Sequence, residues 1–206
     1  LMKALARSGR SEELVARLDK MSDDEFLGMM TELTDEFGTL LSTLETVSDE
    51  TFEKMLENML RALSLKTGQV LHADRVTIFL LDAEKQELWS KVASSDTPLE
   101  IRIPANAGVV GHAVSTGTYV NIPDTSVDPL FHAQVDEATG YRTKNLLAAP
   151  FFDRHGNVMG AVELLNKTTS SHFDAFDEKQ LEDFVKPLGV VLESWLKMSR
   201  MGAKRA

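Results

Sequence analysis

The central part of the chain alternates apolar and polar positions with the period of two that is typical of β-strands. Residues 75–82 are rich in β-branched and aromatic side chains, and residues 87–93 alternate after a short polar break, so the two segments predict a hairpin. The same pattern predicts four further short strands, at residues 101–104, 119–123, 146–152 and 158–165. About six short strands joined by turn-rich links indicate an antiparallel sheet.

Helical periods of three to four residues flank these strands. A Ser-x-x-Glu spacing from Ser22 to Glu25 and an acidic start at Ser48 predict two helices in the N-terminal third. After the second start, one helical stripe collects Phe52, Met55, Leu56, Met59, Leu60 and Leu63. A short glycine-bounded helix is predicted at 108–117 and a long one at about 174–200. This order predicts an α+β fold, with helices packed on one face of the sheet and long N- and C-terminal helices.

The last predicted helix carries a second apolar stripe, in alternating steps of three and four residues. Its members are Leu181, Phe184, Leu188, Val191, Trp195 and Met198. This spacing is typical of a seam between two helices and predicts a homodimer. Alternatively, the first three members cover the chain's own sheet, and the N-terminal helices alone hold the dimer. Pro187 is expected to bend or loosen the helix.

Composition narrows the functional classes. The 206 residues include 22 basic and 32 acidic ones, and the net charge of −10 disfavours nucleic acid and anionic membrane surfaces as partners. No apolar run is long enough to span a membrane. The chain has no cysteine, which excludes disulfides and thiolate chemistry and favours a reducing, cytoplasmic setting. The five histidines lack metal-ligand spacing, so no metal site is expected.

The length predicts one domain with extra helical material. We expect an N-terminal helical segment at residues 1–47, a domain with its flanking helices at 48–200, and a basic tail at 201–206.

Polar residues in two settings are candidates for ligand contact. Thr77 and Glu163 lie in strongly apolar predicted strands, where an unpaired polar group costs about 1 to 3 kcal/mol. Each therefore needs either a ligand or a hydrogen bond within the sheet. Residues 124–145 form a long polar segment, and connections of this length inside a compact domain are usually functional or mobile. Its clustered polar residues predict either a lid or a solvated loop with exposed side chains. They are Asp136, Thr139 and Thr143.

The helix start at residues 108–111 is a further candidate. Its backbone amides offer hydrogen bonds to an anion, and the positive end of the helix dipole favours negative charge there. Taken alone, a glycine-bounded helix start is also typical of a plain turn.

One spaced signature joins the end of the last predicted strand to the start of the last helix. It consists of Asn166, Lys167, Phe173, Asp177 and Glu178. Supporting motifs lie at residues 79–82, 100–104, 108–112, 121–124 and 140–145. Together they resemble GAF domains of the cyclic-nucleotide-binding type, as in cyanobacterial adenylate cyclases and cyclic-nucleotide phosphodiesterases. The resemblance covers about residues 50 to 197.

The resemblance implies that a purine and a cyclic phosphate are enclosed between the sheet and a lid of short helices. The positions implied to contact the ligand are Thr77, Ala93, Ser94, Val109, Val110, His132, Asp136, Thr139, Thr143 and Glu163. The signature residues are implied to lie behind the pocket, with Lys167 and Asp177 as an ion pair. Two positions depart from relatives: Ala93 stands where a base-stacking aromatic is often found, and His132 replaces an aromatic lid residue.

The function implied is regulatory binding of cAMP or cGMP, without catalytic residues of its own, to control an attached catalytic domain. An adenylate cyclase is the first expectation for that domain and a phosphodiesterase the second. The alternative is a GAF domain with no ligand, or a different one, that serves for dimerisation. Methionine sulfoxide reductases of the GAF type and thioether-linked bilin photoreceptors depend on cysteine, which this chain lacks.

Overall fold

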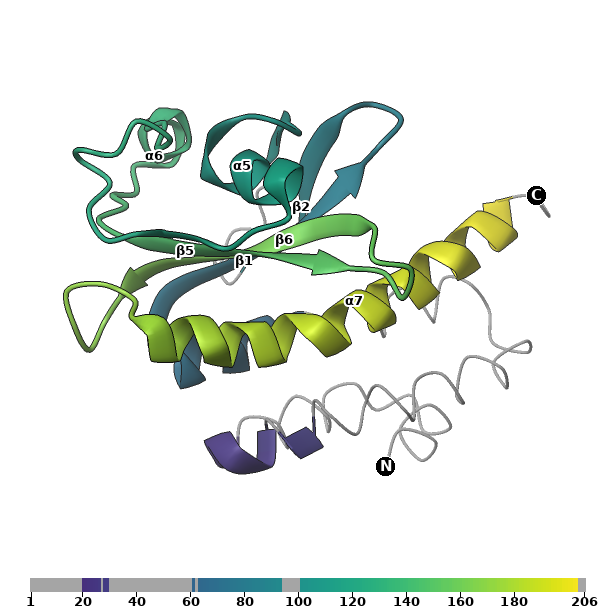
Figure 1. Ribbon diagram of the computed structural model, residues 1–206, viewed down its shortest axis with the longest axis horizontal. Helices are drawn as coiled ribbons and strands as arrows, with labels where there is room; N and C mark the ends of the chain where they lie inside the picture. Colours follow the sequence, from purple (N-terminus) through teal and green to yellow (C-terminus); the bar gives the residue numbers. More distant parts are fainter. Residues whose placement is uncertain (1–19, 27, 30–60, 62, 94–100, 204–206) are drawn as a thin grey trace.

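A six-stranded antiparallel sheet forms the centre of the molecule (Figure 1). The computed structural model describes residues 20–26, 28–29, 61, 63–93 and 101–203. The sheet has the strand order β3-β2-β1-β6-β5-β4. Its strands are β1 (Ala73–Asp82), β2 (Glu87–Ala93), β3 (Arg102–Pro104), β4 (Val120–Ile122), β5 (Leu146–Phe152) and β6 (Val158–Lys167). The predicted fold class and all six predicted strands are confirmed.

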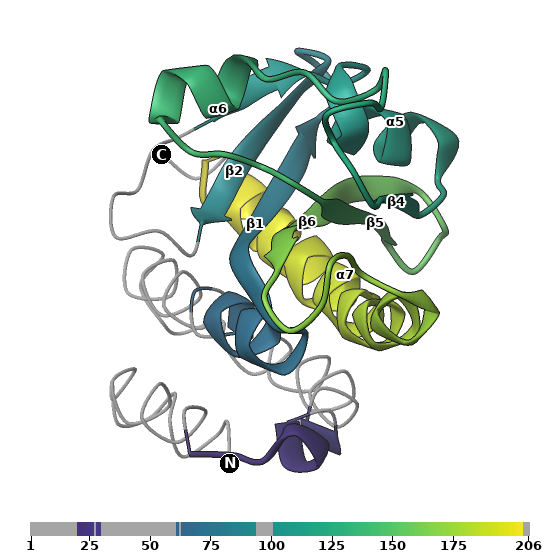
Figure 2. The ribbon, with the colours of Figure 1, turned by 90° about the vertical axis from the view of Figure 1, so that its left-hand side faces the viewer.

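Helices cover both faces of the sheet. The long helix α7 (Ala175–Ala203) lies along one face, whereas α5 (Gly108–Thr116) and α6 (Gln134–Thr139) lie over the other (Figures 1 and 2). The pattern predicted helices on one face, and the short pair adds a second layer. The central strands require this layer because they are apolar on both sides: Ile78 faces the α7 side and Phe79 faces α5, and both are buried.

The main core lies between α7 and the sheet. Leu181, Phe184 and Leu188 are all within 1% of full burial and pack in one cluster with strand residues such as Val162 and Leu164. These three members of the predicted seam therefore cover their own sheet, as the alternative interpretation had it. Trp195 and Met198 have side chains outside the described set. The helix continues through Pro187 from Ala175 to Ala203 without a break.

The described part of the N-terminal segment belongs to the same core. Ser22 and Glu25 form the predicted capping box, in which the Ser22 backbone amide donates to Glu25 Oε2 at 2.9 Å and the Glu25 amide donates to Ser22 Oγ at 3.4 Å. Phe26, one residue later, is 1% exposed, and its ring centroid lies 6.4 Å from that of Phe184 on α7. Lys66 fixes this turn by donating to the Met21 carbonyl at 2.7 Å.

The predicted stripe after Ser48 is described only at its end. Residues 63–70 are helical and precede β1 directly, and Leu63 is 1% exposed in the main core. The earlier stripe members, from Phe52 to Leu60, lie outside the described residues. None of the helices in the described part of the chain is long and apolar enough to cross a membrane.

Candidate functional site

A row of paired residues crosses the sheet on the face covered by α5 and α6. Thr77 on β1 lies opposite Ala93 on β2 and opposite Glu163 on β6, and Glu163 lies opposite Ala148 on β5. Directly paired residues in a sheet point to the same face. Ala148 packs against α5, so the whole row faces α5 and not α7. The sheet register thus brings Thr77 and Glu163 together although 86 positions separate them in the sequence.

Thr77 and Glu163 have no hydrogen-bond partner for their side chains within the described part of the chain. Thr77 is 6% exposed and Glu163 is partly buried. The sequence left open whether a bond within the sheet satisfies them, and no such bond is formed among the described residues. Two adjacent polar groups on an apolar sheet face, neither of them bonded to another described residue, form a place where a polar ligand gains hydrogen bonds.

The carboxyl of Glu163 has a pKa well above its ordinary value. Burial is the main cause, and the negative charge of Asp136 on α6 adds to it, so that the pKa of Glu163 is raised to about 7. Asp136 on α6 is thus close enough to Glu163 for its charge to contribute to this shift in pKa.

A hydrogen-bonded turn holds α6 in this position. The Thr143 backbone amide donates to Asp136 Oδ2 at 2.6 Å, and the Thr143 hydroxyl donates to Oδ1 at 2.8 Å. The Thr143 carbonyl in turn accepts from the Thr125 hydroxyl at 2.7 Å, which links both ends of the 124–145 segment. The expectation of exposed side chains is wrong for Thr143, which is 6% exposed, and Asp136 is partly buried. Loop polarity alone could not show that these residues satisfy each other.

The first turn of α5 flanks the same row. Val109 and Val110 are both buried, and they belong to different apolar clusters on this face, one with Ala148 and the other with Phe79. The cap residue Ala107 forms no side-chain hydrogen bond to the helix, and the first turn has no acidic residue. Among the described residues, no side chain caps the amides at this end. Gly111 is required here because a Cβ would collide with the backbone of Asn106.

The remaining implied contact positions lie in different parts of the chain, and the structure describes some of them only in part. Ala93 ends β2 opposite Thr77, so its position matches the implied site. His132 is exposed and precedes α6. Thr139 ends α6, with its side chain outside the described set, and Ser94 lies outside the described residues. α6 itself was not evident from the hydrophobic pattern, although the resemblance implied short helices in this segment.

The signature residues gather where β6 meets α7. The ion pair implied between Lys167 and Asp177 is present, with Nζ 2.5 Å from Oδ1, and both side chains are at least nine-tenths buried. Lys167 Nζ also donates to the Leu71 carbonyl at 3.0 Å, which joins this corner to the helical segment before β1. Phe173 is fully buried in the main core. This corner lies on the α7 side and does not line the candidate site.

Asn166 is the point at which the alternation of β6 is reversed. Its φ of 55° is left-handed, so its side chain turns to the α6 side, whereas that of Lys167 turns to α7. Asn166 Oδ1 accepts from the Lys144 amide at 2.7 Å, and Nδ2 donates to the Tyr141 hydroxyl at 2.9 Å. The hydroxyl of Tyr141 donates to Asp74 Oδ2 at 2.5 Å. Asn166 thus fixes the end of the 124–145 segment.

Two amide side chains that residue patterns did not assign a role complete this frame. Asn121 on β4 donates through Nδ2 to Glu178 Oε1 at 2.8 Å and to the Phe173 carbonyl at 2.9 Å. Asn145 is 4% exposed, and its Oδ1 accepts from the Lys167 amide at 2.9 Å. The available signal was their polarity next to apolar strand residues, which does not identify the partner.

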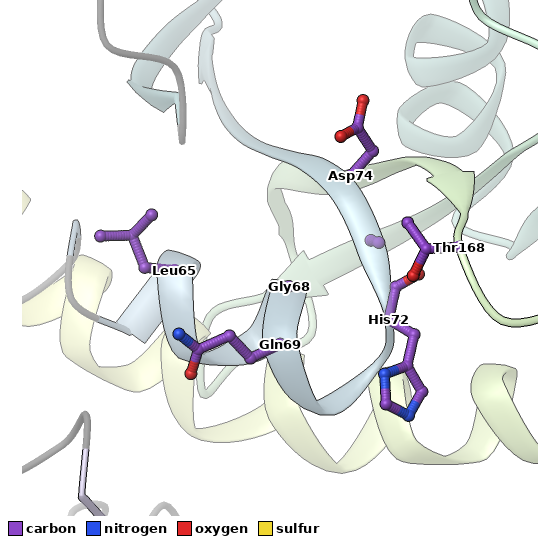
Figure 3. Close-up of a pocket in the computed structure, with 7 residues that line it drawn as sticks. Leu65, Gly68, Gln69, His72, Asp74 and Thr168 are labelled. Atoms are coloured by element: carbon purple, nitrogen blue, oxygen red, sulfur yellow. The ribbon is translucent and has the colours of Figure 1, made fainter.

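A separate open pocket of about 280 Å³ lies at the start of β1 (Figure 3). It is formed where the helical segment 63–70 meets the start of β1 and the residue after β6. Its lining includes Leu65, Gly68, Gln69, His72, Asp74 and Thr168. None of the implied contact residues lines it.

Comparisons with known proteins agree with this architecture. The GAF domain family model matches residues 55–192. The chain is 31% identical over 166 residues to the dual 3′,5′-cyclic-AMP and -GMP phosphodiesterase 11 of Drosophila melanogaster, a match that covers 73% of this chain and 11% of that protein. It is 30% identical over 163 residues to the dual phosphodiesterase 11A of Takifugu rubripes, covering 73% of this chain and 18% of that protein. The chain thus corresponds to less than a fifth of the length of either relative.

Solved structures share the fold at lower identity. The GAF domain of the Acinetobacter phosphoenolpyruvate-protein phosphotransferase has a TM-score of 0.59 at 18% identity, covering 89% of this chain and 99% of that one. The free methionine-R-sulfoxide reductase of Neisseria meningitidis has a TM-score of 0.58 at 18% identity, covering 87% and 96%. At this identity the likeness concerns the fold alone. With the family model matching most of its length, the chain belongs to the GAF domain family.

Proposed function

We propose that this chain is a regulatory domain that binds one cyclic nucleotide, cAMP or cGMP, between the Thr77–Glu163 row and the 124–145 segment. The observation that supports this most strongly is the pair of unsatisfied polar side chains beneath α5 and α6. A purine nucleotide offers an apolar ring face for the flanking clusters and polar edges for these two groups, a combination typical of ligand sites.

The phosphate end is assigned to the first turn of α5. The cyclic phosphate is an anion, and the uncapped amides and dipole of this helix end favour one. Val109 and Val110 carry those amides on the same side of the sheet as Thr77. Asp136 and Thr143 act in this proposal by holding α6 closed over the ligand.

The attached output domain is a second part of the proposal. The relatives named above are phosphodiesterases, which favours a phosphodiesterase as the parent protein over the adenylate cyclase that the sequence motifs favoured first. In either parent the domain controls catalysis that occurs elsewhere, in the cytoplasm and as a homodimer. The cytoplasmic setting is proposed from the lack of cysteine and the homodimer from the apolar stripe of the last helix.

Titration calorimetry of the 206-residue chain with cAMP and with cGMP tests the binding proposal. We expect saturable heat with one site per chain and a rise in unfolding temperature with ligand. Thr77→Val should weaken binding about threefold to tenfold, as expected for a hydrogen bond worth about 0.5 to 1.5 kcal/mol. Thr169→Val is the matched control, because Thr169 is exposed and lies away from the row.

Two results would overturn the proposal. Absence of heat and of thermal stabilisation with both nucleotides at millimolar concentration would leave the ligand-free dimerisation module as the function. Equal affinity of wild type and Thr77→Val would move the site away from this row. Mass spectrometry of small molecules released on denaturation shows whether a nucleotide co-purifies and must be removed first.

A further inference from the structure

We propose that Glu163, already implied as a ligand contact by the family resemblance, lies against the purine, and that the protonation state of its carboxyl sets the preference of the site between adenine and guanine. The inference rests on the proposed function, because it concerns the same site. It adds the group that reads the base and a dependence of base preference on pH.

The charges around the row decide which end of the ligand lies there. Glu163 on β6 faces the carboxylate of Asp136 on α6, and the two acidic groups disfavour an anion between them. The cyclic phosphate therefore lies toward α5, whose first turn has no acidic residue. The neutral base is left for the acidic end of the site.

Glu163 is the acidic group with hydrogen-bonding capacity to spare. Both oxygens of Asp136 already accept from Thr143, at 2.6 and 2.8 Å. Glu163 accepts and donates no hydrogen bond within the described part of the chain, and the side chain opposite it on β5 is the small one of Ala148. The hydroxyl of Thr77 lies beside it on β1, also without a partner among the described residues. A base edge can therefore reach the carboxyl.

The two protonation states of a carboxyl match different purine edges. A neutral carboxylic acid has one O–H donor and one acceptor, and these match the N1 acceptor and the N6 amino donor of adenine. A carboxylate is an acceptor only, and it matches the N1–H and the 2-amino group of guanine, two donors side by side. A carboxylate opposite adenine N1 places two acceptors against each other, which disfavours binding. The neutral acid also pairs with guanine through O6 and N1–H, so guanine suits both states.

The surroundings of Glu163 place the change between its two protonation states near neutral pH. Burial, with the Asp136 charge as a second cause, raises the pKa of Glu163 to about 7. From β1 and β5 the carboxyl faces the uncharged Thr77 and Ala148, and α5 presents Val109 to this side of the sheet. Asp136 on α6 is the charged group that faces it among the described residues.

Calorimetric titrations with cAMP and cGMP at pH 5.5 and pH 8.5 test the proposal. The measured quantity is the ratio of the two dissociation constants, because effects of histidines on the shared phosphate cancel in it. We expect the preference for cGMP over cAMP to grow at least tenfold from the lower to the higher pH. Cyclic inosine monophosphate, which has N1–H and O6 but no 2-amino group, should bind more weakly than cGMP at pH 8.5 and about equally at pH 5.5.

Glu163→Gln separates this role from a general effect of pH. The amide stays neutral at both pH values, so the ratio of the constants should be the same at pH 5.5 and 8.5. Glu137→Gln is the control, because Glu137 is exposed on α6 and the substitution is the same. A ratio independent of pH in the wild type, or equally dependent on pH in Glu163→Gln, would overturn the inference. Failure of either nucleotide to bind at any pH would instead overturn the proposed function.

Discussion

Glu163 and Lys167 both lie on β6, four positions apart, but their side chains lie in different environments. Lys167 is paired with Asp177 and bonded to the Leu71 carbonyl, so its charge is satisfied although the side chain is 9% exposed. Among the described residues, Glu163 has the uncharged Thr77 beside it on β1 and the carboxylate of Asp136 as the charged group near it. Charge alone therefore does not indicate a role, because Lys167 stabilises the fold whereas Glu163 is available to a ligand.

The pH dependence of stability follows from Glu163. Its pKa is raised from 4.5 to about 7 in the folded chain, so between these values the folded state holds a proton that the unfolded state releases. Stability from this group is complete below about pH 4.5 and is lost as the pH rises to about 7. At about 1.4 kcal/mol per pKa unit, the loss is on the order of 3 kcal/mol. Glu163→Gln should remove this dependence.

Urea unfolding of both proteins at several pH values measures the effect. The stability of the wild type relative to Glu163→Gln should fall between pH 4.5 and 7.5 and stay level above. A relative stability that rises over this range would mean that the carboxyl is charged and paired in the folded chain.

Replacement of Lys167 should act through the fold. Lys167→Ala leaves Asp177, which is almost fully buried, with an uncompensated charge, and breaking such a pair costs about 3 to 5 kcal/mol. We expect a clear drop in the urea midpoint. The fraction of the variant that remains folded should bind the ligand with the affinity of the wild type. Lys85→Ala is the control, since Lys85 forms an exposed pair with Asp82 at 3.7 Å and should change stability by less than about 0.5 kcal/mol. An unchanged midpoint with lost binding would place Lys167 in contact with the ligand.

At the scale of elements, the position of α7 on the sheet depends on a close backbone approach. A Cβ at Gly189 would collide with the carbonyl oxygen of Phe152, at the end of β5. The helix lies this close because the residue at the contact has no side chain. The approach in turn allows Leu188 and Phe184 to reach the core between α7 and the strands.

Two glycine substitutions separate this contact from helix propensity. Gly189→Ala should destabilise the chain by more than about 2 kcal/mol, because backbone atoms must move apart. Gly28→Ala should be neutral or stabilise by up to about 1 kcal/mol, since Gly28 is helical and no atom lies within 4 Å of the added methyl group. Thermal unfolding of the two variants and the wild type measures both. Equal effects would show that the approach of α7 to Phe152 is not tight.

Hydrogen bonds attach the segment between β4 and β5 to the sheet. Its ends are bonded to each other through Thr125 and Thr143, and Asn166 and Tyr141 attach its last residues to β6 and β1. The ion pair of Lys167 with Asp177 lies on the α7 side of the sheet, where Asn121 also links β4 to Glu178 at the start of α7. A ligand under α6 therefore borders a frame that continues into the long helix, and it shifts that helix only as far as it binds one arrangement more tightly.

At the scale of the whole molecule, we expect a homodimer. Leu181, Phe184 and Leu188 are occupied by their own core, so a seam must use the later part of the stripe, with Trp195 and Met198, or the N-terminal segment. Phe26 packs on Phe184, so removal of the N-terminal segment would open the core of the domain itself. The test therefore requires the full chain.

Light scattering of the full chain at tens of micromolar should give the mass of a dimer. Trp195→Glu should lower that mass toward one chain, because a buried charge in an apolar seam is costly. Phe176→Glu is the control, since Phe176 is on the same helix, outside the stripe and 68% exposed. A monomeric mass for the wild type would contradict the homodimer, and a dimeric Trp195→Glu would assign the interface to another surface.

Local patterns along the sequence determined the elements of this protein. The period of two in residues 75–82 and 158–165, the glycine-bounded helix at 108–117 and the Ser22 capping box depend on neighbouring residues, and each is present in the structure. α6 was not evident in this way, because a helix of six residues is too short to establish a hydrophobic period. The signature spacing predicted the Lys167–Asp177 pair only through its resemblance to a family.

Tertiary structure decided the relations between distant residues. The register of β1 with β6 places Thr77 beside Glu163, and the left-handed backbone at Asn166 turns Lys167 away from that row. Asp136 accepts hydrogen bonds from Thr143, whereas Glu163 has no such bond to another described residue, and both facts depend on how α6 lies on the sheet. The spacing of Leu181 suited either a seam with a partner chain or the chain's own core. Long-range packing decides which apolar surfaces contact each other. It depends on many contacts between distant residues, which a local period in the sequence does not reveal.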